Sequence, residues 1–353
     1  MAISEINNVP VQKAATIPRE FVSVVIPCLN EERFIGKALR NLADQYDSQR
    51  YEIIVVDGLS QDRTRDVIAE FCRERPDVPV TLIDNPARRI PAALNLGIRA
   101  ARGDIIARLD AHAVASPGYI RRSVEVLRQQ GVGVVGMPCQ VCPGADTLTA
   151  KAIATAVSHP FGIGDAKYRL GRGTGQQAVD TVAFACFRKT LWEEIGGFNE
   201  KLAANEDYEF NYRVRKHGQT VLLDQTEHCD YFARATLKDL AQQYWRYGRW
   251  KARMIRSNPG SIKLRQIVAP VFAASIPVLL LAGIWLRPAW WLLAVELAAY
   301  LLLGIMVAAR LAAKREGGLG LLFLLPLIFT LIHISWGTGF WLGLVKPPVV
   351  DGF

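Results

Sequence analysis

The sequence predicts an α/β domain with a mostly parallel sheet, followed by a region of three membrane-spanning helices. Short runs of β-branched residues alternate with segments of helical periodicity through the first third of the chain, and from residue 266 to residue 346 the chain is almost entirely apolar. Strands that alternate with helices are typical of a doubly wound sheet with helices on both faces. The first 265 residues carry most of the charge, which marks the division between the two regions.

The predicted elements follow one another closely from residue 22 to residue 109. We expect strands at Val22–Pro27, Tyr51–Val56, Val80–Ile83 and Asp104–Leu109, and helices at Glu31–Gln45, Asp62–Arg75 and Pro91–Ala101. A further strand is expected at Val132–Val135 and a further helix at Asn205–Lys216. The glycine-rich stretch from Gly162 to Gly175 predicts a mobile loop over a site.

Polar residues stand where a binding crevice is expected. Asn30–Glu31, Asp57 and Asp110 follow three predicted strands, and ligands of open α/β sheets bind beyond the carboxyl ends of the strands. Each residue alone could serve a turn, but three such ends favour a site. Glu206 and Asp207 begin the later helix, where the helix dipole favours ionised carboxylates, and an ionised carboxylate can act as a general base.

Composition and charge exclude several classes of protein. The chain has 353 residues, of which 50% are hydrophobic, and a net charge of +9. Its lysines and arginines are scattered or lie beside apolar segments, which favours anionic lipid and a phosphorylated substrate over nucleic acid. The six cysteines show no framework spacing, and Cys139 and Cys142 alone are too few ligands for a zinc site, so we expect free thiols. The first 20 residues show no signal peptide, so the first domain is expected in the cytoplasm.

Three apolar segments are long enough to cross a bilayer, at about Ile267–Leu286, Ala289–Ala309 and Leu319–Val345. Basic residues precede the first segment and separate the second from the third. If all three segments cross, both basic clusters fall on one side, which places the large domain in the cytoplasm and the C-terminus outside. The expected regions are a flexible tail (1–20), a cytosolic domain (21–235), amphipathic interfacial helices (236–265), the spans (266–346) and an extracytoplasmic tail (347–353).

Two ionisable residues lie inside the predicted spans. Glu296 and His333 are functional candidates by their position, because charged groups are rare in a membrane. Each stands alone in its segment, however, and a hydrogen bond between helices explains it equally well. Both interpretations stay open at this point.

Five stretches of the chain together resemble a known family. They are VSVVIPCLNEE, IIVVDGLSQDRT, AALNLGIRAARGDIIARLDAH, GGFNEKLAANEDYEFNYRVRKHG and QQYWRYGRW, and they cover roughly Phe21–Trp250. Their order and spacing resemble the family 2 inverting glycosyltransferases of GT-A (Rossmann-like) fold. In particular, the chain resembles the membrane-anchored glycosyltransferases of succinoglycan-type bacterial exopolysaccharide biosynthesis, which also have three C-terminal spans. The resemblance implies a multi-pass enzyme of the bacterial inner (cytoplasmic) membrane.

The resemblance also implies which residues bind the nucleotide sugar. Pro27, Glu31 and Asp57 look like contacts to the base and ribose, while Arg89 and Arg246 are candidates for the diphosphate. An exposed surface arginine is the commoner outcome for Arg89. The sequence departs from many relatives after Asp57, where a glycine replaces a second carboxylate. This departure leaves the identity of the nucleotide open.

Asp110-Ala111-His112 resembles the family's DxD element, with histidine in the second acidic position. Residues i and i+2 of an extended segment point the same way, so Asp110 and His112 could bind one divalent cation. A carboxylate with an imidazole suits Mn²⁺ somewhat better than Mg²⁺. The alternative is that His112 is a turn residue.

The catalytic roles also follow from the resemblance. Asp207 is similar to the family's base, which takes a proton from the acceptor hydroxyl, and Glu206 is the weaker candidate. The stretch from residue 243 to residue 247 resembles the family's QxxRW element, which lies over the donor diphosphate and the acceptor. Its candidate residues are Gln243, Trp245, Arg246 and Tyr247, with Trp250 nearby. The same segment could equally be an amphipathic helix at a bilayer surface.

The resemblance implies an inverting, metal-dependent hexosyltransferase. Our preferred reaction moves glucose from UDP-glucose to a lipid-linked oligosaccharide and forms a β-glycosidic bond. The expected partners are the UDP-sugar donor, this acceptor, membrane lipid and other proteins of a polysaccharide assembly complex, and nucleic acid is not among them. The alternatives are transfer to a polyprenyl phosphate, processive polysaccharide synthesis, and a nucleotide-sugar-binding scaffold of an export complex that has no enzymatic activity.

Overall fold

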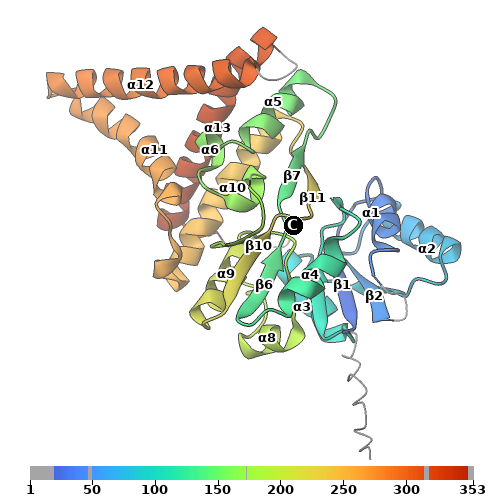
Figure 1. Cartoon of the computed structure of the whole chain (residues 1–353). Coiled ribbons are helices and arrows are strands. Elements are labelled where there is room, and N and C mark those ends of the chain that lie inside the picture. The colour runs from blue at the N-terminus through green and yellow to red at the C-terminus, as the bar shows by residue number, and fades with distance from the viewer. Residues whose placement is uncertain (1–19, 47–49, 172, 314–317, 349–353) are drawn as a thin grey trace, which may run out of the picture.

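The structure is a computed structural model that describes residues 20–46, 50–171, 173–313 and 318–348. Most of the two predicted tails, 1–20 and 347–353, lies outside the described residues. The described part consists of a sheet domain, a small second sheet beside it, and a group of long apolar helices (Figure 1).

The main sheet is mixed and mostly parallel. Among the described residues it has eight strands in the order β3-β2-β1-β4-β9-β6-β10-β8. Their bounds are β1 Val22–Cys28, β2 Tyr51–Asp57, β3 Val80–Asp84, β4 Ile105–Arg108, β6 Val132–Gly136, β8 Gln176–Ala178, β9 Cys186–Arg188 and β10 Thr220–Asp224. Strand β1 pairs in parallel with β2 and β4, whereas β9 and β8 are antiparallel to their neighbours. The predicted α/β sheet is thus confirmed.

Helices cover both faces of this sheet. In the sheet domain they are α1 Ile35–Leu42, α2 Thr64–Glu74, α3 Ile90–Ala100, α4 Tyr119–Leu127, α8 Lys189–Glu194 and α9 Glu206–Lys216. Alternate residues of β1 enter two different cores: Val24 packs on the side of α1, and Val25 on the side of α3. On the α3 side the contact is close, because a Cβ at Gly97 would lie 2.5 Å from Val25 Cγ1. Burial on both faces explains why these strands are apolar throughout.

A smaller sheet and several short helices stand beside the main sheet. The strands are β5 Ala113–Ala115, β7 Cys139–Cys142 and β11 Cys229–Phe232, in the order β5-β11-β7. The helices are α5 Leu148–Ala156, α6 Pro160–Ile163 and α7 Lys167–Leu170. The glycine-rich stretch predicted as a loop therefore contains two short helices and, just after it, strand β8. Figure 1 shows β7 and β11 between the main sheet and the apolar helices.

The three predicted membrane helices are present in the described part of the chain. They are α11 Arg265–Ala282, α12 Arg287–Ala312 and α13 Gly318–Val345, and each is long and apolar enough to cross a bilayer. These helices indicate that the protein associates with a membrane. In Figure 1 they enclose a triangle, and α11 and α12 meet at the corner far from the sheet.

The two ionisable residues of these helices have partners on neighbouring helices. Glu296 accepts a hydrogen bond from Ser275, at 2.7 Å, and the Nδ1 atom of His333 lies 2.8 Å from the hydroxyl of Tyr300. These contacts join α11 to α12 and α12 to α13. The structure therefore supports the interpretation that both residues hold helices together.

A long helix connects the sheet domain to the apolar helices. This is α10, Leu237–Ser257, and it carries the segment that resembles QxxRW. A short 3-10 turn, η2 at Pro259–Ser261, follows it and leads into α11. One face of α10 is buried, and it packs along α13 rather than standing free at a surface.

Candidate active site

The carboxyl ends of the parallel strands meet at one edge of the sheet, as the sequence predicts. Cys28, the last residue of β1, is the register partner of Asp57, the last residue of β2. Strand β4 runs parallel to β1 on its other side, and Asp110 follows it by two residues. The acidic residues predicted at these ends thus lie along a common edge.

Asp57 is completely buried and held in a fixed network. Its carboxylate accepts hydrogen bonds from the backbone N–H of Ser60, at 3.0 Å, and from Nε of Arg65, at 2.7 Å. Arg65 also pairs with Asp84, the last residue of β3. Asp84 was not among our predicted site residues, although it follows a predicted strand as Asp57 does. It brings a second carboxylate to this side of the edge.

Arg108 is the centre of the second acidic cluster and was missed by the sequence analysis. Its side chain is 4% exposed and contacts the carboxylates of Asp110, at 3.3 Å, Glu206, at 3.1 Å, and Asp207. One buried cation therefore faces three carboxylates. The signal in the sequence was an arginine within the apolar run Ile105–Leu109, since a charge is seldom buried without a partner.

The local structure explains how Glu206 and Asp207 reach this arginine. Helix α9 begins at Glu206, and the preceding residue, Asn205, has a left-handed backbone with a φ of 64°. The Asn205 amide donates a hydrogen bond to the carbonyl oxygen of Tyr247 in α10, at 3.2 Å. The turn therefore joins the start of α9 to α10 and directs both acids toward β4.

The pKa of Asp207 is raised to about 7. Burial is the largest cause, and the charges of Glu206 and Asp110 add to it, whereas Arg108 opposes the shift. We had expected the helix dipole to favour the ionised form, but desolvation is stronger at this buried position. A carboxyl group with a pKa near neutrality is well suited to accept a proton in a reaction.

Asp110 and His112 meet the requirements of a divalent cation in part. Both side chains line one cavity, and the Nδ1 atom of His112 lies 3.0 Å from Glu31. Burial lowers the pKa of His112, but the hydrogen bond to Glu31 and the nearby carboxylate charges outweigh it, so this pKa is raised. A carboxylate on one ring nitrogen is the usual support of a histidine that binds metal through the other. The two residues therefore fit a cation that takes its other ligands from the substrate.

No group of three or more histidine, cysteine or acidic side chains in the described part of the chain is arranged to hold a metal by itself. Two protein ligands are few for a tightly held ion, but they are usual where phosphate oxygens complete the coordination of a divalent cation. A divalent cation held here would therefore need further ligands from a phosphorylated molecule.

A cavity of about 710 Å³ connects the acidic cluster with the apolar helices. At one end it is lined by Arg108, Asp110, His112, Glu206 and Asp207. At the other end it is lined by side chains of α11, α12 and α13, namely Phe272, Tyr300, Leu303, Ile332, His333 and Trp336. The cavity is therefore polar and charged at one end and apolar at the other, which suits an amphiphilic ligand.

Tyrosines and a guanidinium also line this cavity. Arg169 in α7 lies over the ring of Tyr231, with 5.1 Å from its central carbon to the ring centroid. Tyr244 and Tyr247 of α10 line the same cavity. Among the described residues, Arg169 has no carboxylate within ion-pair distance. A partly buried cation without a counter-charge is costly, so this position favours an anionic ligand group.

The segment that resembles QxxRW lies partly in the cavity. Gln243, Arg246 and Tyr247 line it, and the Gln243 amide donates hydrogen bonds to the hydroxyls of Tyr231 and Tyr247, at 3.2 and 3.1 Å. Arg246 also donates to the carbonyl oxygen of Ala203, at 3.0 Å, in the turn before α9. These contacts bring the segment to the acidic cluster.

Two tryptophans of the same helix lie elsewhere. Trp245 is 37% exposed, and Arg249 stacks on its ring at 4.8 Å, outside the set of residues that line the cavity. Trp250 is buried against Tyr208 and Met254 in a separate small core. The structure thus places both rings away from the cavity, and their predicted contact with acceptor or diphosphate stays a prediction.

The remaining predicted donor residues surround the edge of the sheet without lining the cavity. Pro27 is buried within β1, opposite Val56. Glu31 reaches the site through His112. Arg89 donates a hydrogen bond to the carbonyl oxygen of Glu200, at 2.8 Å, which holds it beside the turn before α9. Their roles toward a nucleotide stay predictions.

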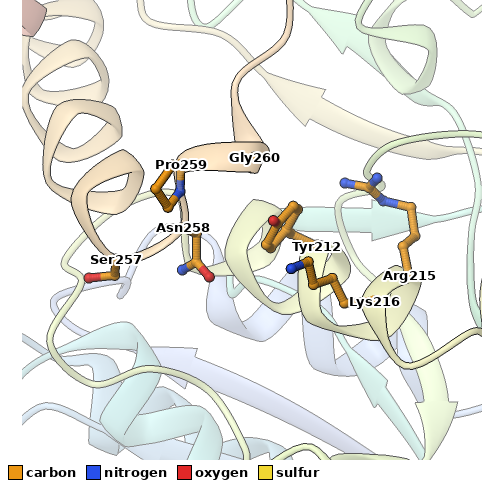
Figure 2. A pocket seen from close by; sticks show the side chains of 7 residues that line it. All are labelled: Tyr212, Arg215, Lys216, Ser257, Asn258, Pro259 and Gly260. Carbon is orange, nitrogen blue, oxygen red and sulfur yellow. The ribbon is translucent and has the colours of Figure 1, made fainter.

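A second hollow lies apart from the acidic cluster. It has a volume of about 510 Å³ and lies between the end of α9 and the turn from α10 to α11. Figure 2 shows Tyr212 and Lys216 beside Asn258 and Gly260 in this hollow, with Arg215 at one side. It contains basic and neutral polar groups and, among the residues that line it, no carboxylate. It therefore lacks a group that could act as a base.

The chain is similar to known proteins over most of its length. The model of the family described as "Glycosyl transferase family 2" matches residues 23–196. "Succinoglycan biosynthesis protein ExoA" of Rhizobium meliloti (strain 1021) is 29% identical over 320 residues, which cover 90% of this chain and 93% of that protein. "Dolichyl N-acetyl-alpha-D-glucosaminyl phosphate 3-beta-D-2,3-diacetamido-2,3-dideoxy-beta-D-glucuronosyltransferase" of Methanococcus voltae is 26% identical over 331 residues, or 92% of this chain and 98% of that protein.

A solved structure shares the fold. The "Mannosyltransferase PcManGT from Pyrobaculum calidifontis in complex with GDP-Man and Mn2+" superposes with a TM-score of 0.63 at 20% identity, over 93% of this chain and 87% of that one. At this identity the likeness shows the fold alone. It extends beyond the sheet domain, and the fold class predicted from the sequence is confirmed.

Proposed function

The chain belongs to glycosyl transferase family 2, and from this premise we propose that it is an inverting hexosyltransferase with a lipid-linked oligosaccharide as its acceptor. The proposed donor is UDP-glucose, and the proposed product is a β-glycoside. One relative named above supports a lipid-linked acceptor, since its name contains a dolichyl-linked sugar phosphate, and another, named for succinoglycan biosynthesis, supports a role in polysaccharide synthesis. The basic residues beside the apolar helices favour a catalytic domain on the cytosolic face.

One observation carries the proposal. A single cavity is lined by the carboxylates of Asp110 and Asp207 and also by the apolar side chains of α11, α12 and α13. A water-soluble sugar acceptor would have no use for the apolar end. An acceptor with a lipid tail fits both ends, because its saccharide can reach Asp207 while its lipid contacts the helices.

Asp207 serves as the base in the proposed reaction. The acceptor hydroxyl oxygen forms a bond to the anomeric carbon as the bond from that carbon to the donor's diphosphate oxygen breaks, and the hydroxyl proton passes to Asp207. A pKa of about 7 lets this carboxylate be ionised before the reaction and hold the proton afterwards. Arg108 keeps the carboxylate in place through its direct contact.

Asp110 and His112 would hold the divalent cation, Mn²⁺ or Mg²⁺. When bound, this ion neutralises negative charge on the leaving diphosphate. Glu31 orients the His112 ring through its contact with Nδ1, which leaves Nε2 as the nitrogen available for the ion. Asp57 and the loop around it are assigned to the nucleoside, at the neighbouring part of the same edge.

Purified protein in lipid nanodiscs tests this function. With Mn²⁺, a lipid-linked oligosaccharide and one nucleotide sugar at a time, UDP-glucose should release UDP, and the mass of the lipid product should increase by one hexose. Removal of the divalent ion with a chelator should stop the reaction. Binding of UDP without any sugar transfer would instead favour the scaffold that lacks enzymatic activity.

A second candidate function is direct transfer to a polyprenyl phosphate. The observation that favours it is Arg169, a cation without a carboxylate partner in the described residues, which lines the same cavity. A phosphate acceptor is already anionic and needs no base. Asp207→Asn should therefore strongly lower transfer to a lipid-linked oligosaccharide but be tolerated with polyprenyl phosphate, which separates the two functions.

A further inference from the structure

The third apolar helix does not follow the path that three consecutive membrane crossings require. We propose that α13 lies in the plane of the membrane, against the catalytic domain, and that α11 and α12 form a hairpin that crosses the bilayer twice. The C-terminal end of α13 then lies on the same side as the catalytic domain, whereas the sequence predicts an extracytoplasmic tail there. Six observations lead to this inference.

The N-terminal end of α13 is packed on the catalytic domain. A Cβ at Gly320 would lie 2.5 Å from Leu148 Cδ2 at the start of α5. Leu321, Leu325 and Phe329 share one buried core with the alanines and Ile153 of α5. This half of α13 therefore lies beside a part of the chain that precedes all three apolar helices.

The C-terminal half of α13 packs just as closely on α10. A Cβ at Gly339 would overlap the carbonyl oxygen of Trp245, and one at Gly343 would lie 2.7 Å from that of Arg249. Gly339 and Gly343 form a GxxxG pair, which allows two helix backbones to approach. The two helices run in the same direction, because the later residue of α13, Gly343, contacts the later residue of α10, Arg249. Helices α10 and α13 therefore lie side by side in one plane, and the orientation of one helix in the membrane fixes that of the other.

The charges on α10 show where this plane lies. Arg249, Arg253 and Arg256 donate hydrogen bonds to the carbonyl oxygens of Lys346, Pro348 and Leu344 at the end of α13. If α13 crossed the bilayer, α10 would enter the hydrocarbon beside it with these guanidinium groups. Guanidinium groups are costly to place in the hydrocarbon of a membrane. The plane of α10 and α13 is therefore at the membrane surface.

The end of α13 also meets the beginning of α11. The indole N–H of Trp341 donates to the carbonyl oxygen of Pro270, at 2.8 Å, and that of Trp336 to the carbonyl oxygen of Gln266, at 3.4 Å. After three crossings, the end of the third helix must be on the opposite side from the start of the first. In this structure the end of α13 lies beside the start of α11, so the chain crosses the membrane an even number of times between these two points.

The hairpin of α11 and α12 has the features of a crossing pair. Helix α11 has 18 residues, or about 27 Å, close to the hydrocarbon thickness of a bilayer. The turn to α12 exposes Trp285, Trp290 and Trp291 beside Arg287, which is typical of a membrane–water interface. That interface lies at the corner of the triangle far from the sheet (Figure 1). It marks the opposite side of the membrane.

The free face of α13 has the chemistry of a lipid contact. Leu319, Phe323 and Leu327 are more than half exposed at successive turns, and Trp341 and Val345 continue the stripe at the other end. The opposite face is buried on the catalytic domain. An apolar stripe continuous with a membrane hairpin fits the acyl chains of the near leaflet, in which α13 would be half embedded.

Cysteine labelling in whole cells tests the arrangement. Arg287→Cys, Lys346→Cys and Asp77→Cys are each compared with the parent chain, whose six cysteines give the background. Asp77 lies on the exposed surface of the catalytic domain and serves as the reference for its side. A membrane-impermeant maleimide should label Arg287→Cys in intact cells. It should label Lys346→Cys and Asp77→Cys at least about tenfold less until the membrane is permeabilised.

Two labelling outcomes would overturn the proposal. Labelling of Lys346→Cys in intact cells at the rate of Arg287→Cys would show that α13 crosses, and protection of Arg287→Cys would show that the hairpin does not. A second measurement leaves the whole chain unaltered apart from a reporter after its last residue. We expect fluorescence from a green fluorescent protein and no activity from an exported alkaline phosphatase, and the reverse pattern would contradict the inference.

Discussion

Two acidic clusters share one edge of the sheet but differ in the balance of their charges. Asp57 is completely buried, and Arg65 and the Ser60 backbone N–H satisfy its carboxylate. Arg108 is also buried, yet it faces three carboxylates, and the pKa of Asp207 among them is raised to about 7. The first cluster is a fixed support, whereas the second contains a carboxyl group, that of Asp207, whose pKa lies near neutrality.

The difference follows from the local structure. Asp57 ends a strand, and the turn after it bends back so that its own residues reach the carboxylate. Asp207 begins a helix from another part of the chain and shares its cation with two other acids. Burial with a full set of partners fixes a charge, whereas burial with too few partners makes protonation easier. Four predictions test this contrast.

The largest effect is expected at the second cluster. Asp207→Asn removes the base but keeps the shape of the side chain, so kcat with a lipid-linked oligosaccharide should fall by about 10²–10⁴, the usual contribution of a positioned general base. The measurement is UDP release at saturating donor and acceptor. The KM for UDP-glucose should change by less than threefold, an order-of-magnitude expectation for a group that acts on the acceptor.

A matched control is available for this variant. Asp66 is also an acid in the first turn of a helix, but it is 71% exposed and far from Arg108 in the fold. Asp66→Asn should leave kcat unchanged. If Asp207→Asn were as active as this control with an oligosaccharide acceptor, the role assigned to Asp207 would be wrong.

The first cluster should respond in substrate binding rather than in kcat. Asp57→Asn weakens charged hydrogen bonds worth about 1.5–3 kcal/mol, so the KM for UDP-glucose should rise by roughly 10- to 100-fold as the loop loses its support. Steady-state kinetics with varied donor provides the measurement. A large fall in kcat at unchanged KM would contradict this prediction, because it would show that the Asp57 cluster acts on the reaction step rather than on donor binding.

The pH dependence sharpens the same contrast. Because Asp207 must be ionised to accept a proton, kcat should fall by about tenfold for each pH unit below about 7. Its raised pKa also means that the folded protein holds this proton to a higher pH than the unfolded chain does. This group should therefore lower the free energy of unfolding as the pH rises from about 4 to about 7.

Asp207→Asn cannot titrate and is the control for both measurements. The free energy of unfolding of this variant relative to the parent should increase between pH 5 and pH 8, as judged by denaturant unfolding. The residual kcat of the variant should no longer fall as the pH drops below about 7. A parent profile that is flat from pH 5 to pH 8 would exclude Asp207 as the titrating base.

The sequence predicted the first half of the fold well because its signals are local. Apolar strands and amphipathic helices alternate there, and the positions of Asp57 and Asp110 follow from the ends of parallel strands. Arg108 was missed because its role depends on helix α9, about a hundred residues later in the chain. Likewise, the length of α13 predicts a span, but its contact with α10 depends on glycines that pair across nearly a hundred residues.

The smallest effect tests which part of α10 belongs to the site. Arg246 lines the cavity, whereas Arg249, three residues later, stacks on Trp245 outside it. Lysine keeps the charge but loses the planar set of donors, so Arg246→Lys should lower kcat/KM by up to about tenfold, the value of one charged hydrogen bond. Arg249→Lys should change it by less than about twofold. Equal effects of the two variants would favour a purely interfacial helix, since a bilayer surface would not distinguish neighbouring turns of α10.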